Sequence, residues 1–299
     1  RLMWLRKGPV IAALYPIGML ILQLVLAIAA GWFLGGLAEW GADRVSPVLG
    51  KVAFWGVFLA VVALLLRWFR KIDNKLYAYY LMHDYAYSAR SKGRNTPELE
   101  ARMAQFGDAI AEALQSDVDE VLVVGHSSGA HLGVSILADL IRAGRVPENG
   151  PALGFLTLGQ VVPMVSFLPD AGRLRADLYD LSQAHELTWV DVTAPGDGCA
   201  FALCDPVIVS GVDPGNNKVW PLVISAAFTQ TLSPERWAEL RWKFFRLHFQ
   251  YLCAFDRPGE YDYFRITAGP LTLSRRYRDR APSKSRIDIP ASKYTSMTP

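Results

Sequence analysis

The sequence has few cysteines, and each of them stands alone. Only Cys199, Cys204 and Cys253 occur among 299 residues, and an odd number cannot form a complete set of disulfide bonds. We therefore expect three core cysteines in a protein from a reducing compartment, and their spacing lacks the second pair of ligands that a metal site needs. The hydrophobic fraction of 52% excludes a disordered chain, and no internal repeat is present.

Charged residues are also absent from the longest apolar stretch. The stretch from Gly8 to Ala38 holds 31 uncharged residues, and a membrane-spanning helix needs about 20. A second stretch, Val52–Leu66, is shorter but lengthens if Lys51 and Arg67 extend towards the lipid headgroups. We predict a transmembrane helical hairpin within residues 1–72, with spans at about 10–38 and 47–68.

The charges that flank the two spans predict an orientation. Basic residues precede the first span and follow the second, whereas the connecting loop from Glu39 to Lys51 has no net charge. The positive-inside rule then places both ends in the cytoplasm. We expect an integral protein of the inner, or cytoplasmic, membrane with its remaining domain on the cytoplasmic side. A cleaved signal peptide followed by a core helix is the alternative, but the apolar run is too long and lacks a clear cleavage site. The sequence begins with Arg1 rather than Met, which suggests that the natural N-terminus lies upstream.

Beyond the hairpin, short apolar runs alternate with helical patterns. This alternation predicts an α/β domain over residues 73–274, with a mostly parallel sheet flanked by helices. The expected strands are 76–82, 121–124, 154–158 and 187–193, and the expected helices are 97–114 and 130–143. Residues 275–293 carry seven basic and two acidic side chains, so we expect 275–299 to be a flexible basic tail that is solvated or contacts anionic lipid.

The segment Gly125-His126-Ser127-Ser128-Gly129 follows one expected strand and precedes an expected helix. This G-x-S-x-G pattern is typical of a sharp strand-to-helix turn, in which flanking glycines avoid clashes and the central residue adopts a strained conformation. The turn raises the Ser127 hydroxyl above the strand end, near the positive end of the helix. We interpret Ser127 as a nucleophile; an ordinary tight turn with an inert serine is the alternative.

A serine nucleophile needs a histidine to accept its proton and a carboxylate to orient that histidine. The sequence offers five histidines. His126 lies in the turn, His131 lies on the following helix, and His83 precedes the serine. His185 and His248 remain as candidates for the base.

At this point the sequence resembles the α/β-hydrolase superfamily over residues 76–270. The resemblance implies the chain order serine, acid, histidine, which favours His248 over His185. It also implies an acid in the turn after the penultimate strand, which favours Asp197 in the segment 194–198. Asp205 is the rival acid, and Asp191 lies within the expected strand itself.

The same resemblance implies an oxyanion hole. The backbone N–H of Ser128, next to the nucleophile, supplies one donor. The second should come from the loop after the expected strand 76–82, but this chain has His83-Asp84-Tyr85 where many relatives have a His-Gly pair. The second donor therefore stays unknown, near His83–Tyr85.

Together these features predict a membrane-anchored serine hydrolase that cleaves ester or thioester bonds of lipid-like acyl substrates through an acyl-enzyme. A catalytically silent hydrolase fold that serves as a membrane scaffold is the alternative. A transport role is disfavoured because neither span carries an internal charge. The expected partners are membrane lipids and a small acyl substrate. No cofactor, metal or nucleic acid is implied.

Overall fold

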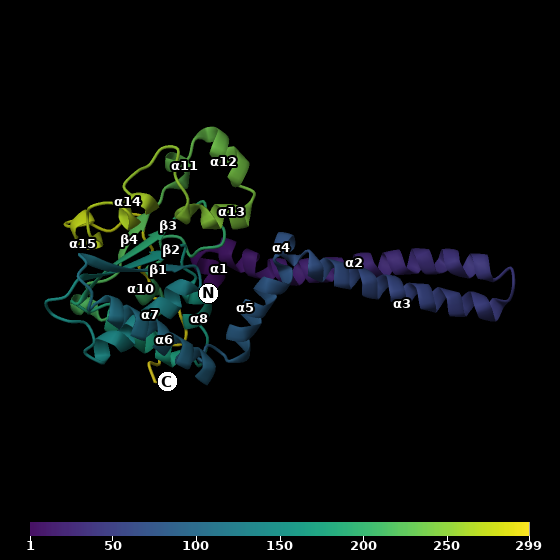
Figure 1. Ribbon diagram of the computed structural model, residues 1–299, viewed down its shortest axis with the longest axis horizontal. Helices are drawn as coiled ribbons and strands as arrows, with labels where there is room; N and C mark the ends of the chain where they lie inside the picture. Colours follow the sequence, from purple (N-terminus) through teal and green to yellow (C-terminus); the bar gives the residue numbers. More distant parts are fainter. Residues whose placement is uncertain (299) are drawn as a thin grey trace. The chain divides into compact units, whose positions relative to one another are not determined.

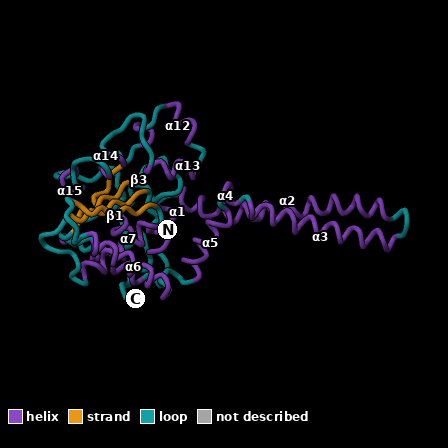
Figure 2. The backbone as a smooth tube through the Cα atoms, viewed as in Figure 1, coloured by secondary structure: helices purple, strands orange, loops and turns teal. Residues whose placement is uncertain are grey.

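The computed structural model describes residues 1–298 and divides the chain into two compact units (Figures 1 and 2). The α/β unit contains residues 1–10 and the chain from Ser88 onwards, and the hairpin unit contains Ile11–Tyr87. The boundary that we expected at residue 72 therefore falls inside the hairpin unit, which continues to Tyr87.

Two long helices form the hairpin unit: α2, Lys7–Ala42, and α3, Pro47–Lys71. Ser46 begins α3 by accepting a hydrogen bond from the backbone N–H of Val48 at 3.3 Å, and Pro47 occupies the first turn, where a missing N–H costs nothing. The helices pack closely at small residues, since a Cβ on Gly31 would lie 3.0 Å from Phe58.

The two helices keep most of their apolar surface exposed. In their most apolar windows only 17% and 11% of the residues are buried, and the mean hydropathy of each window is 2.3. A core helix of a water-soluble protein would be mostly buried, so this exposure favours lipid as the surrounding medium. Both helices are long and apolar enough to cross a membrane, in agreement with the expected spans.

A short turn of helix and a longer one complete this part of the chain: α4, Asp73–Leu76, and α5, Ala78–Arg90. The prediction of a strand at residues 76–82 is therefore wrong. The segment from Ala78 to Arg90 contains no Val, Ile or Thr, and its Ala, Leu and Met residues favour a helix despite the aromatic content.

The centre of the α/β unit is a four-stranded sheet with the order β1-β2-β3-β4, and every neighbouring pair is parallel. The strands are β1, Glu120–His126; β2, Ala152–Leu158; β3, Leu187–Thr193; and β4, Leu222–Ser225. The first three match the expected strands. Sequence reasoning missed β4, a strand of only four residues that directly follows Pro221. In this register His126 pairs with Leu158, and Leu158 pairs with Val192, so the carboxyl ends of the strands meet at one edge.

Helices and loops cover both faces of the sheet (Figure 1). Phe155 and Trp189 belong to the core on the side of α7 and α9, whereas the alternate residues Leu156 and Val190 belong to the core on the other side. The helices of this unit are α1, Leu2–Leu5; α6, Pro97–Ala113; α7, Gly129–Arg142; α8, Val162–Ser166; α9, Gly172–Leu181; α10, Pro206–Val209; α11, Phe228–Thr231; α12, Pro234–Leu240; α13, Phe244–His248; α14, Tyr263–Thr267; α15, Leu273–Arg276; and the 3₁₀ turns η1, Gly215–Asn217, and η2, Phe249–Leu252.

The C-terminal segment makes specific contacts with the α/β unit, which differs from the expected flexible tail. The backbone of Ile287 donates to the carbonyl of Leu203 at 2.7 Å and accepts from the N–H of Asp205 at 2.9 Å. The buried guanidinium of Arg175 donates to the carbonyl of Ser296 at 2.6 Å. Composition alone predicted a solvated tail because these contacts use the backbone, which charge counting ignores.

The three cysteines are free, but only one of them is fully buried. Cys204 lies in the core with Phe201, Cys199 is half-buried, and Cys253 is exposed. The expectation that all three lie in the core is therefore wrong for Cys253.

Candidate active site

Ser127 occupies the turn between β1 and α7 and has a left-handed backbone, with φ of +56°. A non-glycine residue in this region costs on the order of 1–3 kcal/mol, and such strain is concentrated at functional sites. The N–H of Ser127 donates to the carbonyl of Leu158 at the end of β2, at 2.9 Å, which holds the turn against the sheet edge. The residue is partly exposed, so its hydroxyl is not enclosed in the core.

Only one of the two glycines in the motif is required by close packing. A Cβ on Gly125 would lie 2.7 Å from the carbonyl oxygen of Gly129 and 3.0 Å from the Cα of Ala130. A Cβ on Gly129 would have no atom within 4 Å. Close packing therefore requires glycine at Gly125, where the helix passes the strand, but not at Gly129.

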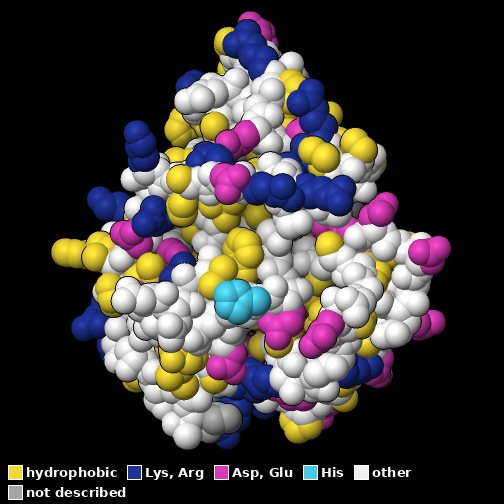
Figure 3. All heavy atoms as spheres, turned by 90° about the vertical axis from the view of Figure 1, so that its left-hand side faces the viewer, with side chains coloured by type: hydrophobic (Ala, Val, Ile, Leu, Met, Phe, Trp, Pro, Cys, Tyr) yellow, Lys and Arg dark blue, Asp and Glu magenta, His cyan; other side chains and the backbone are white. Residues whose placement is uncertain are grey.

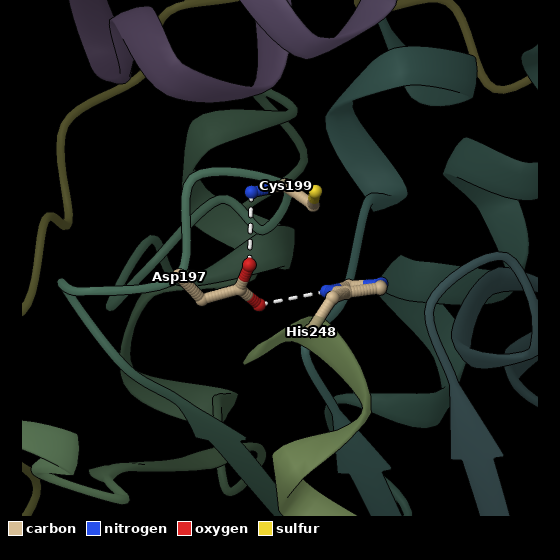
Figure 4. A group of neighbouring side chains, drawn as sticks. All are labelled: Asp197, Cys199 and His248. Atoms are coloured by element: carbon tan, nitrogen blue, oxygen red, sulfur yellow. Dashed lines mark hydrogen bonds and ion pairs between the residues drawn. The ribbon is translucent and has the colours of Figure 1, made fainter. Parts of the chain in front are cut away.

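Asp197 lies in the loop after β3, where its carboxylate accepts three hydrogen bonds. Figure 4 shows those from Cys199 and His248. One Oδ atom accepts from the backbone N–H of Cys199 at 2.9 Å. The other accepts from Nδ1 of His248 at 2.7 Å and from the hydroxyl of Tyr251 at 3.1 Å. Because three donors engage both of its oxygens, the buried carboxylate is fixed in orientation.

Tyr251 is a site residue that sequence reasoning missed. Its ring is fully buried, and its hydroxyl accepts from the backbone N–H of Ala194 at 2.9 Å while it donates to Asp197. Burial, with the neighbouring charge of Asp197, raises the pKa of Tyr251 well above 10, so the hydroxyl keeps its proton. One signal was available, because Tyr251 follows His248 by three residues and such residues share a face in a helical run.

The hydrogen bond to Asp197 fixes the tautomer of His248. Nδ1 carries the proton that it donates, and the second ring nitrogen, Nε2, faces away from Asp197 (Figure 4). A Cβ on Gly159 would lie 3.1 Å from Cε1 of this ring. Gly159 follows Leu158, whose carbonyl binds the N–H of Ser127, so the ring lies at the same sheet edge as the serine turn.

Ser127 follows His126, whose ring lies 4.6 Å from the His248 ring, but the serine itself is not joined to His248. Among residues 1–298 no hydrogen bond links the Ser127 hydroxyl to the His248 ring. Contacts between a nucleophile and its base are often loose when no substrate is bound.

His126 connects the serine turn to the helix that carries His248. Its Nε2 donates to the backbone carbonyl of His248 at 2.9 Å, and the two rings lie 4.6 Å apart. Burial, followed by the proximity of His248, lowers the pKa of His126 to about 4, so the ring is neutral at neutral pH. His126 is therefore a neutral hydrogen-bond donor and not a second candidate for the base.

The rival acid is used elsewhere. Asp205 begins α10 by accepting from the backbone N–H groups of Val207 and Ile208, and it forms an ion pair with Nζ of Lys218 at 2.8 Å. Asp191 lies within β3 and accepts from the Thr157 hydroxyl at 2.6 Å. Of the three aspartates considered, only Asp197 meets His248.

The remaining histidines, His185, His131 and His83, are not paired with Asp197. His185 is exposed and precedes β3, so it lies at the opposite edge of the sheet from Ser127. Burial lowers the pKa of His131, on α7, to about 4, and its Nδ1 has no hydrogen-bond partner among the described residues. His83 is exposed and belongs to α5 of the hairpin unit.

Ser128 is the N-cap residue of α7, so its backbone lies at the positive end of a 14-residue helix. The expectation of its N–H as an oxyanion donor fits this position and stays a prediction. The loop that should have supplied the second donor is absent, since His83–Tyr85 lie inside α5.

Asp197, Cys199 and His248 also bring potential metal ligands within 4.8 Å of one another, which sequence spacing did not reveal. Their chemistry fits a metal poorly. Hydrogen bonds already engage both carboxylate oxygens and Nδ1 of His248. Burial, with the nearby charge of Asp197, raises the pKa of Cys199 to about 12, so its sulfur stays a neutral thiol rather than the thiolate that zinc binds.

No family model matches this chain, and neither the curated proteins nor the solved structures include a match to it. The structure does contain an α/β unit with a parallel sheet and two long apolar helices. The arguments about function therefore depend on the chain's own residues.

Proposed function

We propose that this protein is a membrane-anchored serine hydrolase of the α/β-hydrolase type, acting on ester or thioester bonds of lipid-like acyl substrates. The observation that supports it best is the 2.7 Å hydrogen bond between Asp197 and His248, at the sheet edge where Ser127 has its left-handed backbone. The order along the chain supports the same proposal, because the serine follows β1, the acid follows β3, the penultimate strand, and the histidine follows β4.

In the proposed mechanism, Ser127 Oγ attacks the acyl carbonyl while Nε2 of His248 accepts its proton. Asp197 stabilises the resulting imidazolium, and the N–H of Ser128 donates to the oxyanion. Nε2 then protonates the leaving alkoxide or thiolate as the tetrahedral intermediate collapses to the acyl-enzyme. Water, deprotonated by the same nitrogen, releases the carboxylic acid and restores the serine. Apart from substrate and water, each step needs only groups that the chain itself supplies.

The proposed location follows from charge. The basic residues around the hairpin, such as Lys7 and Arg70, favour a cytoplasmic position for both ends, with the α/β unit on the cytoplasmic side of the inner membrane. Attachment of a cysteine-reactive, membrane-impermeant reagent to the exposed Cys253 tests this side. We expect labelling in inverted vesicles and not in intact cells, and the reverse result would contradict the orientation.

Activity-based labelling tests the chemistry. The full-length protein in detergent is treated with a fluorophosphonate, which reacts with an activated serine. We expect that wild-type protein is labelled and that Ser127→Ala and His248→Ala abolish the labelling. Asp205→Asn is the matched control, since it alters a buried aspartate with no contact to His248.

A catalytically silent scaffold is the second candidate, and the absence of a hydrogen bond between Ser127 and His248 is the observation that favours it. In that case a folded wild-type protein, eluting as one species in size-exclusion chromatography, would not be labelled. Labelling that survives in Ser127→Ala would identify a different nucleophile and would contradict the proposed site.

A further inference from the structure

The segment from Arg241 to Phe249, which we call the interfacial strip, exposes three large aromatic side chains beside the candidate site. The exposed fractions are 72% for Trp242, 52% for Phe244 and 48% for Phe249. Aromatic groups exposed together in a short segment favour a contact with an apolar or interfacial partner rather than with water alone.

The charges of the same segment identify the kind of partner. The interfacial strip contains the exposed basic residues Arg241, Lys243 and Arg246 and no acidic residue of its own. Glu239, on the preceding helix, pairs with Lys243 at 3.1 Å and with Arg246 at 3.9 Å, so the strip and this carboxylate together carry a net charge of +2. The guanidinium of Arg241 lies over the Trp242 ring at 5.6 Å. Basic groups around aromatic rings fit the surface of an anionic membrane, where rings enter the interface and each cation contributes about 1 kcal/mol.

The interfacial strip borders the candidate catalytic groups directly. The Phe249 ring lies 4.8 Å from the His126 ring, and His248 itself belongs to the strip. Near Asp197, a Cβ on Gly198 would lie 3.4 Å from the Phe244 ring. A surface that binds lipid here would be next to the site.

The first turn of α2 contacts the loop after β3, which contains Asp197 and Gly198. A Cβ on Gly8 would lie 2.7 Å from the carbonyl oxygen of Gly198, so the two backbones meet with no side chain between them. Arg6 strengthens this contact by donating to the carbonyl of Ala202 at 2.8 Å. From Val10 the chain continues without a break into the apolar run that could cross a membrane.

From these contacts we propose that the interfacial strip binds the surface of an anionic lipid bilayer, and that the site takes its acyl substrate from that leaflet. The substrate class is then an ester or thioester of a bilayer-resident lipid rather than of a water-soluble compound. The surface contact stands on the strip alone, whereas the substrate class depends on the proposed hydrolase.

Photo-crosslinking tests the surface contact without using activity. The full-length protein carries p-benzoylphenylalanine in place of Trp242 and is placed in nanodiscs of phosphatidylcholine with phosphatidylglycerol. The control carries the same group in place of Phe264, which is 51% exposed on α14. Figure 3 shows the side of the α/β unit with α14 and α15, where charges of both signs lie between separate hydrophobic groups.

We expect lipid adducts at position 242 to exceed those at 264 at least fivefold, and to decrease when phosphatidylglycerol is omitted. Equal adduct yields at the two positions, or none at 242, would overturn the surface contact. The same comparison in a Ser127→Ala background should give the same ratio, so failure of the hydrolase proposal leaves this readout intact.

Kinetics test the substrate class. Trp242→Ser with Phe244→Ser should lower hydrolysis of a fluorogenic lipid ester in the nanodisc about tenfold, equal to about 1.4 kcal/mol, while hydrolysis of a short soluble ester stays within twofold. The matched control, Phe106→Ser with Phe264→Ser, removes two rings of 52% and 51% exposure and should change neither rate. Equal losses on both esters, or none on the lipid ester, would overturn a lipid substrate taken from the leaflet.

Discussion

Two aspartates in the same stretch after β3 illustrate how partners, rather than burial, separate a candidate catalytic group from a structural one. Asp197 and Asp205 are each 2% exposed. Asp197 binds a histidine, a tyrosine and a backbone N–H, whereas Asp205 begins a helix and pairs with Lys218. The first set of partners leaves Nε2 of His248 available for proton transfer, whereas the second set includes no imidazole.

The largest expected effect comes from removing the charge at Asp197. Asp197→Asn keeps the shape of the side chain but favours the wrong tautomer of His248, so we expect kcat to fall about 10³–10⁴-fold. Steady-state hydrolysis of a soluble ester measures it. A loss below tenfold in a folded variant would remove Asp197 from the mechanism.

For Asp205 we expect the opposite result, namely a loss of stability with little change in activity. Asp205→Ala removes the cap of α10 and leaves Lys218 without its partner, so we expect a loss of about 2–3 kcal/mol in the free energy of unfolding. Denaturant titration of the detergent-solubilised protein measures this loss. Activity per folded molecule should stay within threefold, and a drop similar to that of Asp197→Asn would erase the distinction between the two aspartates.

Tyr251 tests how strongly the hydrogen bonds to Asp197 matter. Tyr251→Phe removes one of three donors to the carboxylate, and a hydrogen bond to a charged group contributes about 1.5–3 kcal/mol. We expect kcat/KM to fall about tenfold, with His248 still bound to Asp197. Tyr261→Phe is the matched control, because its hydroxyl donates only to the backbone carbonyl of Tyr251. If both variants lose the same activity, Tyr251 acts through packing alone.

The last comparison concerns Asp191, the third of the aspartates considered for the site, and it tests stability rather than activity. Burial raises its pKa from 3.8 to about 8, so the folded protein holds a proton that the unfolded chain releases. Stability from this group is therefore complete below pH 4 and is lost as the pH rises towards 8. Asp191→Asn removes the loss, so the difference in Tm between variant and wild type should grow from pH 5 to pH 8. The exposed Asp117→Asn should show no such trend, and a flat difference for Asp191→Asn would contradict the raised pKa.

Patterns along the chain were enough to predict most of the sheet and three candidate residues. Strands β1, β2 and β3 are short apolar runs bounded by charged residues or glycine, and such runs have few other interpretations. Asp197 and His248 were expected from the chain order that the resemblance to the α/β-hydrolase superfamily implies after Ser127. The segment 76–82 was assigned wrongly because aromatic content fits both strand and helix, and only the lack of β-branched residues separates them.

Other features depend on contacts that no linear pattern records. Tyr251 reaches Asp197 across 54 residues, and the hydrogen bond of His126 joins it to a backbone carbonyl 122 residues away. The C-terminal segment is held through backbone groups such as those of Ile287, which every residue possesses. Long-range hydrogen bonds of this kind become visible only when the chain is folded.

The left-handed backbone of Ser127 limits which amino acids could ever occupy that position. A β-branched residue such as threonine or valine is a severe outlier in this region, whereas serine, cysteine and aspartate have unbranched β-carbons that tolerate it better. Mutation can therefore exchange a hydroxyl for a thiol or a carboxylate while the bend survives. If the proposed mechanism holds, the turn restricts the nucleophile at this position to a few residue types, and a single substitution could exchange one for another.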